Sequence, residues 1–363
     1  MKQIVCDRRA LHRIPELVRD LPRTMEYLRN ALSGLSCQLT SPIPNSLCAW
    51  FDKGADAAIA FRSDADALPI SETTNLPFAS EIPGHMHACG HDGHMSMLLE
   101  LARRLDTMPA DRNFLLIFQP AEETTGGAED ICKTGILEGK NVQAIFALHI
   151  WPKLPKGLIF SRKNELMARS CELDVEIIGR SSHIAQAENG IDALLAGAEF
   201  IRRARQIELS FSDDVYRLLR FGKMSSGNTR NIVSDRTRME GTLRSFQDDV
   251  HSVMLEGLKT AAVEISQETG CEIRVSASQG YPAVINTPEV FERVLGCGVE
   301  VHTLERPSMI TEDFSWYQKH VPGMLFFLGA GDCPMLHTNS FNFDEAILDS
   351  GASFLEALAR NYR

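Results

Sequence analysis

The sequence predicts an α/β protein with a central, mostly parallel sheet in a domain built from both ends of the chain, and an inserted α+β domain. Two patterns carry this prediction. In the outer parts of the chain, short continuous apolar runs alternate with helical segments, as in a sheet covered on both faces. In the middle, strand-like segments alternate apolar and polar residues, as in a sheet with one face open to solvent. A length of 363 residues also favours two domains over one.

The N-terminal part begins with helices and continues with strands. Apolar residues at helical spacing predict helices over residues 7–17 and 19–32, and a loop rich in Pro, Ser and Asn follows at 41–46. The predicted strands of the covered sheet are the apolar runs 57–61, 114–118, 144–148 and 324–328. A predicted helix over 93–106 separates the first two runs, so that strand, helix and strand alternate.

The middle of the chain has a β-α-β-β-α-β order. Its predicted strands are 171–178, 215–223, 236–246 and 271–276, and its predicted helices are 191–208 and 249–268. Acidic residues at the start of the second helix and Gly270 at its end are typical helix boundaries. This order predicts a ferredoxin-like domain over residues 172–281, inserted into a catalytic domain formed by residues 1–171 and 282–363.

Composition disfavours several functional classes. The 44% hydrophobic and 23% charged fractions are typical of a folded globular protein. With 37 basic and 48 acidic residues the formal charge is −11, which disfavours a nucleic-acid partner. No apolar run reaches the roughly 18 residues of a membrane span, and a charge precedes any signal-peptide core. Nine cysteines without a CxxC pair indicate a reducing compartment, so we expect a cytoplasmic protein.

Side chains that can bind metals follow the apolar runs, where open α/β sheets bind their ligands. They are Asp64 and Asp66 after the first run, four histidines, a cysteine and an aspartate within residues 85–94, Glu122 and Glu123 after the second run, His149 after the third and His337 after the fourth. Each alone has an ordinary alternative, such as a core histidine, a solvated carboxylate pair or turn chemistry. Their repetition at successive strand ends predicts a metal site.

Five of these side chains form the predicted ligand set, which is Cys89, His91, Glu123, His149 and His337. Five ligands are too many for one closed tetrahedral site and suit two cations such as Zn²⁺, Mn²⁺, Co²⁺ or Ni²⁺ that share a bridge. Two such ions can polarise a carbonyl and generate hydroxide at neutral pH. Glu122, next to a ligand, is the expected general base and later acid. Asp66 is expected to orient an imidazole ligand.

These residues resemble the dinuclear metal amidohydrolases of the aminoacylase and carboxypeptidase-G superfamily, and within it the hippurate hydrolase and auxin-conjugate amidohydrolase branch. The matching segments span nearly the whole chain and are 11–17, 64–69, 87–95, 119–127, 148–152, 179–183, 312–314 and 337–338. The resemblance implies a zinc-peptidase-like catalytic domain with an inserted lid and dimerisation domain, and therefore a homodimer. The chain departs from the family pattern at 184–190, at Ser234 and at 308–311.

The resemblance also implies roles for single residues. Cys89 would bridge the two ions, and Asp66 would support the general base from the metal side. His183, often from the partner subunit in this family, would bind the oxyanion. Asn231 and Arg244 would bind the carboxylate or amide of the substrate, and a guanidinium fork suits a carboxylate.

The implied reaction is metal-dependent hydrolysis of the amide bond of a small N-acyl amino acid, with an acetyl, benzoyl or similar acyl group. A di- or aminopeptidase with the same dinuclear site is the alternative that the sequence leaves open.

Overall fold

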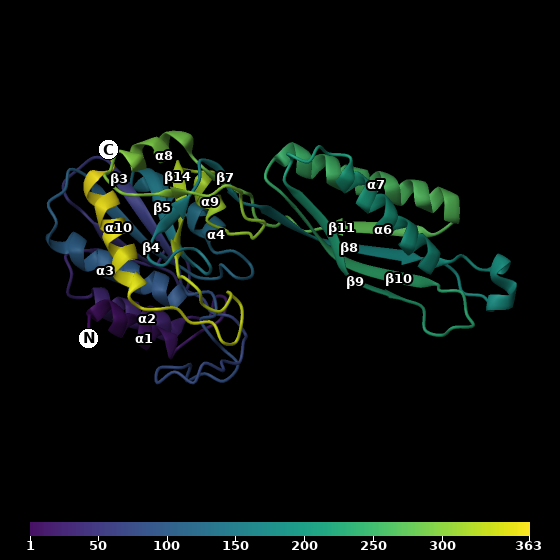
Figure 1. Ribbon diagram of the computed structural model, residues 1–363, viewed down its shortest axis with the longest axis horizontal. Helices are drawn as coiled ribbons and strands as arrows, with labels where there is room; N and C mark the ends of the chain where they lie inside the picture. Colours follow the sequence, from purple (N-terminus) through teal and green to yellow (C-terminus); the bar gives the residue numbers. More distant parts are fainter. The chain divides into compact units, whose positions relative to one another are not determined.

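The computed structural model describes residues 1–363 and divides the chain into two compact units, whose elements are labelled in Figure 1. Unit 1 consists of Met1–Leu166, Ile285–Pro307 and Asp313–Arg363. Unit 2 consists of Met167–Val284 and Ser308–Glu312. The chain therefore leaves unit 1 twice and returns to it twice.

An eight-stranded sheet forms the centre of unit 1, with the strand order β1-β2-β4-β3-β5-β14-β6-β13. Its strands are β1 (Gln38–Thr40), β2 (Leu47–Phe51), β3 (Ala58–Asp64), β4 (Asn113–Gln119), β5 (Val142–Trp151), β6 (Ile159–Ser161), β13 (His302–Thr303) and β14 (Gly323–Gly329). The neighbours β4, β3, β5 and β14 all pair in parallel, and the four apolar runs predicted as strands lie in them. The predicted α/β fold with a mostly parallel central sheet is confirmed.

One buried strand of this sheet was missed by the sequence analysis. All five residues of β2 are buried, and the strand pairs antiparallel with β4. The run is bounded by the polar residues Ser46 and Asp52, as the predicted strands are, but Cys48 and Ala49 dilute its hydrophobic signal. The sheet is therefore mixed, with antiparallel strands outside the parallel centre.

Helices cover both faces of the sheet in unit 1. They are α1 (Gln3–His12), α2 (Pro22–Leu32), α3 (His91–Thr107), α4 (Ala128–Lys133), α5 (Ile136–Gly139), α8 (Pro288–Leu295), α9 (Ser315–Gln318) and α10 (Ile347–Asn361). The helices α1, α2, α3, α8 and α10 share one apolar core with alternate residues of the strands. The helices α4, α5 and α9 pack together, and α5 packs against β5.

Four boundaries of the predicted helices in unit 1 are wrong by two residues or more, and one of them is the start of the first helix, at Gln3 instead of residue 7. The helix predicted over residues 7–17 ends at His12, because Pro15 disfavours helical backbone at the preceding residue. The helix predicted from residue 19 begins at Pro22, since proline suits the first helical turn. The helix predicted from residue 93 begins at His91, after Gly90 in the left-handed region.

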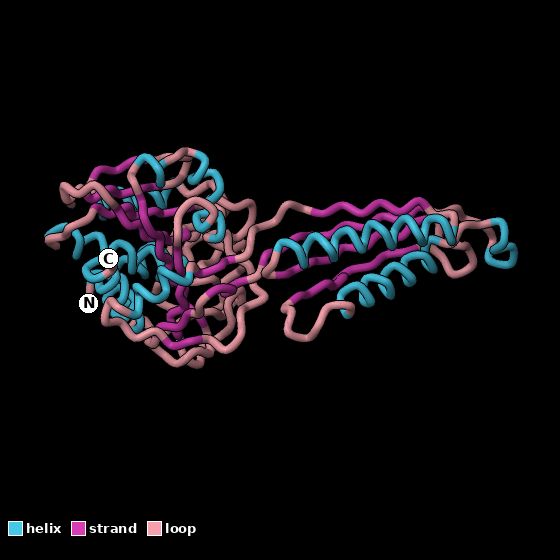
Figure 2. The backbone as a smooth tube through the Cα atoms, turned by 90° about the horizontal axis from the view of Figure 1, so that it is seen from above, coloured by secondary structure: helices cyan, strands magenta, loops and turns pink.

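Unit 2 is an α+β unit with a four-stranded antiparallel sheet in the order β11-β8-β10-β9. Its elements are β8 (Arg169–Ile178), the short helix η1 (Ile184–Asn189), α6 (Ala193–Leu209), β9 (Arg217–Ser226), β10 (Arg236–Ser245), α7 (Asp248–Thr269) and β11 (Glu272–Ala277). The two long helices run along the strands and share one apolar core with the sheet (Figure 2). The predicted β-α-β-β-α-β order is confirmed. A separate two-stranded sheet consists of β7 (Asn164–Met167) and β12 (Val284–Asn286).

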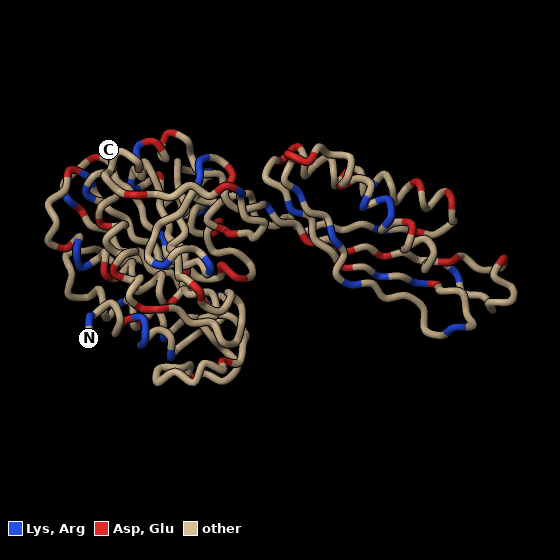
Figure 3. The backbone as a smooth tube through the Cα atoms, in the orientation of Figure 1, with Lys and Arg blue, Asp and Glu red and all other residues tan.

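Charged residues of both signs are interspersed along the chain of each unit (Figure 3). Many form local pairs, such as Lys223 with Glu240 at 2.6 Å across neighbouring strands of unit 2. None of the helices is long and apolar enough to cross a membrane.

Candidate metal centre

The start of α3 places Cys89 and His91. Gly90, between them, has a φ of +88°, a conformation that glycine adopts without strain. The ring of His91 lies with Nδ1 2.7 Å from the carbonyl oxygen of Asp66. Because a carbonyl oxygen can only accept, Nδ1 carries the proton, and Nε2 is left with its lone pair. This Nε2 atom is buried and has no hydrogen-bond partner.

The turn after β4 places Glu122 and Glu123. Ala121, at its start, has a φ of +62°, which is strained for a residue with a side chain. The carboxylate of Asp66 holds this turn, because it accepts the backbone N–H groups of Glu122 at 2.9 Å and of Glu123 at 3.2 Å. Asp66 therefore contacts His91 through its backbone carbonyl and the glutamate turn through its side chain.

His149 lies within β5, two residues before the strand ends, rather than after the strand. Its Nδ1 atom is 2.7 Å from the carbonyl oxygen of Ile150, so this nitrogen is the donor. Its Nε2 atom lies 3.5 Å from Sγ of Cys89. The lone pair of His149 therefore faces the cysteine.

His337 lies in the loop between β14 and α10, where its φ is +61°. Its backbone N–H donates to the carbonyl oxygen of Ala88 at 2.8 Å, which fixes the loop beside Cys89. Its Nε2 atom is 3.3 Å from Sγ of Cys89 and 3.3 Å from Oε1 of Glu123. The side chain is about half exposed, unlike the other four side chains of the predicted ligand set.

The structure thus brings the five predicted ligand side chains together from four separate segments of unit 1. Two buried atoms in the cluster, Nε2 of His91 and Oε1 of Glu123, are 3.7 Å apart and make no hydrogen bond. Buried polar atoms without partners are costly, and a cation between them would satisfy both. A thiol, three imidazoles and a carboxylate are the ligands of borderline divalent metals, so this donor set fits such ions.

Without an ion, the electrostatics of the cluster favour the metal-binding form of the two buried histidines and the protonated form of the thiol. Burial raises the pKa of the Cys89 thiol well above its usual value, and the carboxylates of Glu123 and Glu122 raise it further. Burial lowers the pKa of His91 and of His149, so both imidazoles are neutral. Neutral imidazole is the form that binds metals, whereas the thiol must lose its proton when a cation arrives.

Two further buried residues, Asp64 and His94, lie beside the cluster; both were among the metal-competent side chains of the sequence but outside the predicted ligand set. Oδ1 of Asp64 lies 2.7 Å from Nδ1 of His94, and Nε2 of His94 accepts the N–H of Ile150 at 2.9 Å. Both ring nitrogens of His94 are therefore occupied, and neither is available to a metal. Oδ2 of Asp64 lies 3.6 Å from Nε2 of His91. Asp64 lies at the end of β3, where the sequence analysis placed metal-competent side chains.

The remaining predicted site residues, His183, Asn231 and Arg244, all belong to unit 2. His183 caps η1, where its Nδ1 accepts the N–H of Ala185 at 3.2 Å, and it is exposed. The N–H of Ile184 donates to the carbonyl oxygen of Asn231 at 3.0 Å. His183 and Asn231 therefore lie on two paired loops at one end of the sheet of unit 2.

Arg244 lies at the other end of that sheet, near the end of β10. The register places Arg236 opposite Ile178 and Arg244 opposite Ser170, eight residues apart along both strands. At about 3.4 Å per residue, roughly 27 Å separates these two positions. Nη1 of Arg244 donates to the carbonyl oxygen of Met309, whereas Nε is buried without a partner. Within one chain, Arg244 is therefore far from His183 and Asn231.

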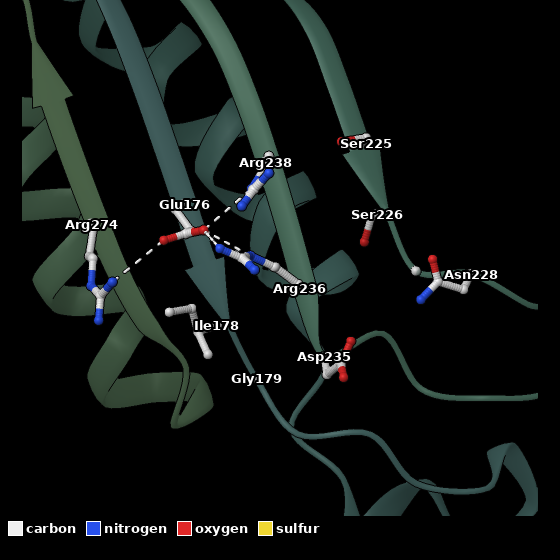
Figure 4. Close-up of a pocket in the computed structure, with 11 residues that line it drawn as sticks. Glu176, Ile178, Gly179, Ser225, Ser226, Asn228, Asp235, Arg236, Arg238 and Arg274 are labelled. Atoms are coloured by element: carbon white, nitrogen blue, oxygen red, sulfur yellow. Dashed lines mark hydrogen bonds and ion pairs between the residues drawn. The ribbon is translucent and has the colours of Figure 1, made fainter.

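The sheet of unit 2 also carries a hollow of about 640 Å³ on its open face (Figure 4). Three guanidinium groups, from Arg236, Arg238 and Arg274, converge there on the carboxylate of Glu176. Arg238 and Arg274 face Glu176 from the two neighbouring strands. The hollow is thus built around a network of ion pairs between strands, of the kind that stabilises an exposed sheet face.

The fold and the cluster in unit 1 together define a metal-dependent hydrolase. The chain matches the peptidase family M20/M25/M40 over residues 60–361 and belongs to this family. The resemblance seen in the sequence is thereby confirmed at the level of the superfamily.

Known proteins resemble the chain over nearly its whole length. An N-acetyldiaminopimelate deacetylase of Lactobacillus helveticus (strain DPC 4571) is 33% identical, over 99% of this chain and 97% of its own. A crystal structure from methicillin-resistant Staphylococcus aureus, described as an aminohydrolase, is 27% identical with a TM-score of 0.92, over 99% and 96% of the two chains. A dinuclear metal-binding peptidase of family M20 from Bacillus subtilis is 29% identical with a TM-score of 0.85, over 98% and 96%.

Proposed function

We propose that the protein hydrolyses the amide bond of N-acyl amino acids, and that it does so with two divalent metal ions. The observation that carries this proposal is the buried cluster beside Glu122, in which atoms of His91 and Glu123 face each other without hydrogen bonds. The proposed ligands are Cys89, His91, Glu123, His149 and His337, with Cys89 as the bridge. The Bacillus subtilis relative, which binds two metals, supports the same number of ions here.

The relatives also support the substrate class. The Lactobacillus helveticus protein is named for removing an acetyl group from diaminopimelate, which is an amino acid. An acetyl group on the amine of an amino acid is therefore the first acyl group to consider for this chain. Benzoyl and other acyl groups remain in the proposal as further substrates.

Glu122 is the proposed general base. Its side chain is only 7% exposed, and Asp66 fixes its backbone N–H. The ions, when bound, would polarise the scissile carbonyl and lower the pKa of the attacking water. Glu122 would take the proton of that water and later return it to the leaving nitrogen, so that the products are a carboxylate and a free amine.

The proposed substrate contacts come from unit 2. His183 would stabilise the oxyanion, and Asn231 and Arg244 would bind the amide and carboxylate of the amino acid. Partial burial lowers the pKa of Arg244, and the buried Nε atom of this half-buried side chain lacks a partner. A substrate carboxylate would supply the missing acceptor with a charge-assisted bond.

The distance between these residues supports a homodimer. One small substrate cannot span the roughly 27 Å between the two ends of the sheet of unit 2. We therefore propose that His183 and Asn231 of one protomer act on a substrate held by Arg244 of its partner. Exposed apolar side chains near the His183 end, at Ile184, Leu194 and Leu195, would contribute to the contact between protomers.

A substrate panel tests the proposed activity. The protein is stripped with a chelator and reloaded with Zn²⁺, Mn²⁺, Co²⁺ or Ni²⁺ in turn. Free-amine release is then measured with N-acetyl, N-benzoyl and N-succinyl amino acids and with unblocked dipeptides. We expect turnover of N-acyl amino acids that depends on added metal. Turnover of dipeptides alone would replace the proposal with the di- or aminopeptidase alternative.

A mixing experiment tests the shared site. His183→Ala and Arg244→Ala should each be nearly inactive alone. If the two residues act across the dimer, refolding an equal mixture creates mixed dimers with one complete site, and about a quarter of wild-type activity returns. No recovery in a mixture shown by mass to contain mixed dimers would mean that both residues serve the same chain.

A further inference from the structure

The segment Glu312–Phe314 contains a buried carboxylate that the proposed function leaves without a role. Asp313 is 0% exposed and is the first residue of unit 1 after the chain returns from unit 2. It is none of the proposed ligands and not the proposed base. A fully buried carboxylate is costly unless its oxygens are satisfied, so its partners indicate what it holds in place.

One side of Asp313 holds the turn that carries Glu122 and Glu123. Its Oδ2 atom accepts the backbone N–H groups of Gly127 at 2.9 Å and of Ala128 at 3.1 Å, at the end of that turn. The two ends of the turn approach closely at this point, and only glycine fits there, because a Cβ atom on Gly127 would lie 2.0 Å from the carbonyl oxygen of Pro120. Asp313 therefore fixes the end of the turn, while Asp66 fixes its middle.

The other side of Asp313 holds Arg62, which is also buried. Nη2 of Arg62 donates to Oδ1 of Asp313 at 2.8 Å, and Nη1 donates to Oδ2 of Asp64 at 3.0 Å. The guanidinium thus lies between two buried carboxylates. Its remaining nitrogen, Nε, donates to Oε1 of Gln119 at 2.8 Å, and Nε2 of Gln119 donates back to Asp313 at 2.7 Å. This closes a ring of hydrogen bonds.

Asp64, the second carboxylate that Arg62 contacts, connects these hydrogen bonds to the histidines of the metal centre. That carboxylate lies 2.7 Å from Nδ1 of His94 and 3.6 Å from Nε2 of His91. The array Asp313–Arg62–Asp64 therefore connects the glutamate turn to the imidazoles through charged side chains with little freedom to move. Metal ligands that must meet at one ion need this kind of support, because small displacements weaken coordination.

We propose that Asp313 is a positioning residue of the metal centre. Together with Arg62 it holds Glu123 and His91 at the separation that a divalent cation requires, and it holds Glu122 beside them. The expected effect on metal affinity depends only on the predicted ligand cluster and not on which reaction the protein catalyses. The effect on turnover rests on the proposed function.

The test compares two variants that each remove one buried negative charge. Asp313→Asn keeps the size of the side chain and one accepting oxygen, but it loses the charge that faces Arg62. The matched control is Asp7→Asn in α1, where an equally buried carboxylate pairs with Arg103 at 2.6 Å, away from the predicted ligands. The metal-free proteins are titrated with Co²⁺ and Mn²⁺ against a competing chelator, and their thermal unfolding is followed by circular dichroism.

We expect Asp313→Asn to weaken metal affinity by about 10–100-fold, which is the effect of losing an outer-shell partner, while Asp7→Asn changes it less than about twofold. Turnover of the metal-saturated Asp313→Asn variant should fall by a similar factor, mainly in kcat. If both variants unfold at a lower temperature than the wild type but bind metal with wild-type affinity, Asp313 has only a structural role and the proposal is wrong.

If Asp313→Asn does not fold, a variant that disturbs the array less can test the proposal. Tyr317→Phe removes the hydroxyl that donates to Oε1 of Gln119 at 3.1 Å, at the outer edge of the array. We expect metal affinity to fall about threefold, because this variant loses only one hydrogen bond, at the periphery of the array. Unchanged metal affinity would count against the proposal. Failure of the proposed function has a different signature, because the wild type would then bind metal tightly and cleave no amide.

Discussion

The variant Glu122→Gln is expected to lose about 10²–10⁴-fold in kcat for an N-acyl amino acid while it keeps both metal ions. Glutamine has nearly the same size as glutamate, but it cannot take a proton from the attacking water or return one to the leaving nitrogen. The backbone N–H of residue 122 would still donate to Asp66, so the turn should keep its conformation. Initial rates of amine release, measured with the metal content of the same samples, check this result.

A nearby control separates the loss of a base from the loss of a charge. Glu129 lies on α4 and pairs with Lys133 at 3.0 Å near the surface. Glu129→Gln should keep kcat within about twofold, because exposed ion pairs contribute little. If metal-replete Glu122→Gln turned over as fast as Glu129→Gln, Glu122 would not be the base.

The second large effect is expected from Cys89→Ala. Sγ of Cys89 lies 3.5 Å from Nε2 of His149 and 3.3 Å from Nε2 of His337, so its loss removes the group that both imidazoles face. We expect the variant to retain fewer than two ions per chain. Its metal affinity should fall by more than the roughly 10–100-fold cost of losing an outer-shell partner. Turnover should fall with metal content, and elemental analysis after dialysis provides the measurement.

Cys48→Ala is the matched control for this experiment. Cys48 is fully buried in β2, where burial raises the pKa of its thiol to about 12, and it contacts none of the predicted ligands. Its truncation should lower stability by about 1 kcal/mol through a small cavity and leave the metal content unchanged. Two ions bound to Cys89→Ala with wild-type affinity would remove the thiol from the site.

Much of the fold and of the candidate site could be predicted from the sequence because both are encoded locally. The strands β3, β4, β5 and β14 are continuous apolar runs; three of the candidate ligands follow or end such runs, and the other two lie within a dense cluster of histidines at the start of α3. The four strands of unit 2 alternate, and their order matches one common motif. In each case neighbouring residues in the sequence carry the signal.

The parts that escaped prediction depend on contacts between distant segments. Asp313 and Arg62 are 251 positions apart in the sequence, and no local pattern around either residue predicts that they form an ion pair. The occupied ring nitrogens of His94, which exclude it as a ligand, come from Asp64 and from Ile150 in another strand. A pattern of residue types cannot show which of several buried histidines keeps a free lone pair.

The passage of the chain between the two units has a consequence for incomplete chains. Strand β14 pairs with β5 at the centre of the sheet, yet it comes after unit 2 in the sequence, as does His337. A fragment that ended after unit 2 would contain every strand of that unit's sheet but lack one candidate ligand. Its β5 would have an unpaired apolar edge, which invites association with other chains. A full complement of two ions per chain would therefore report that the chains are full-length as well as folded.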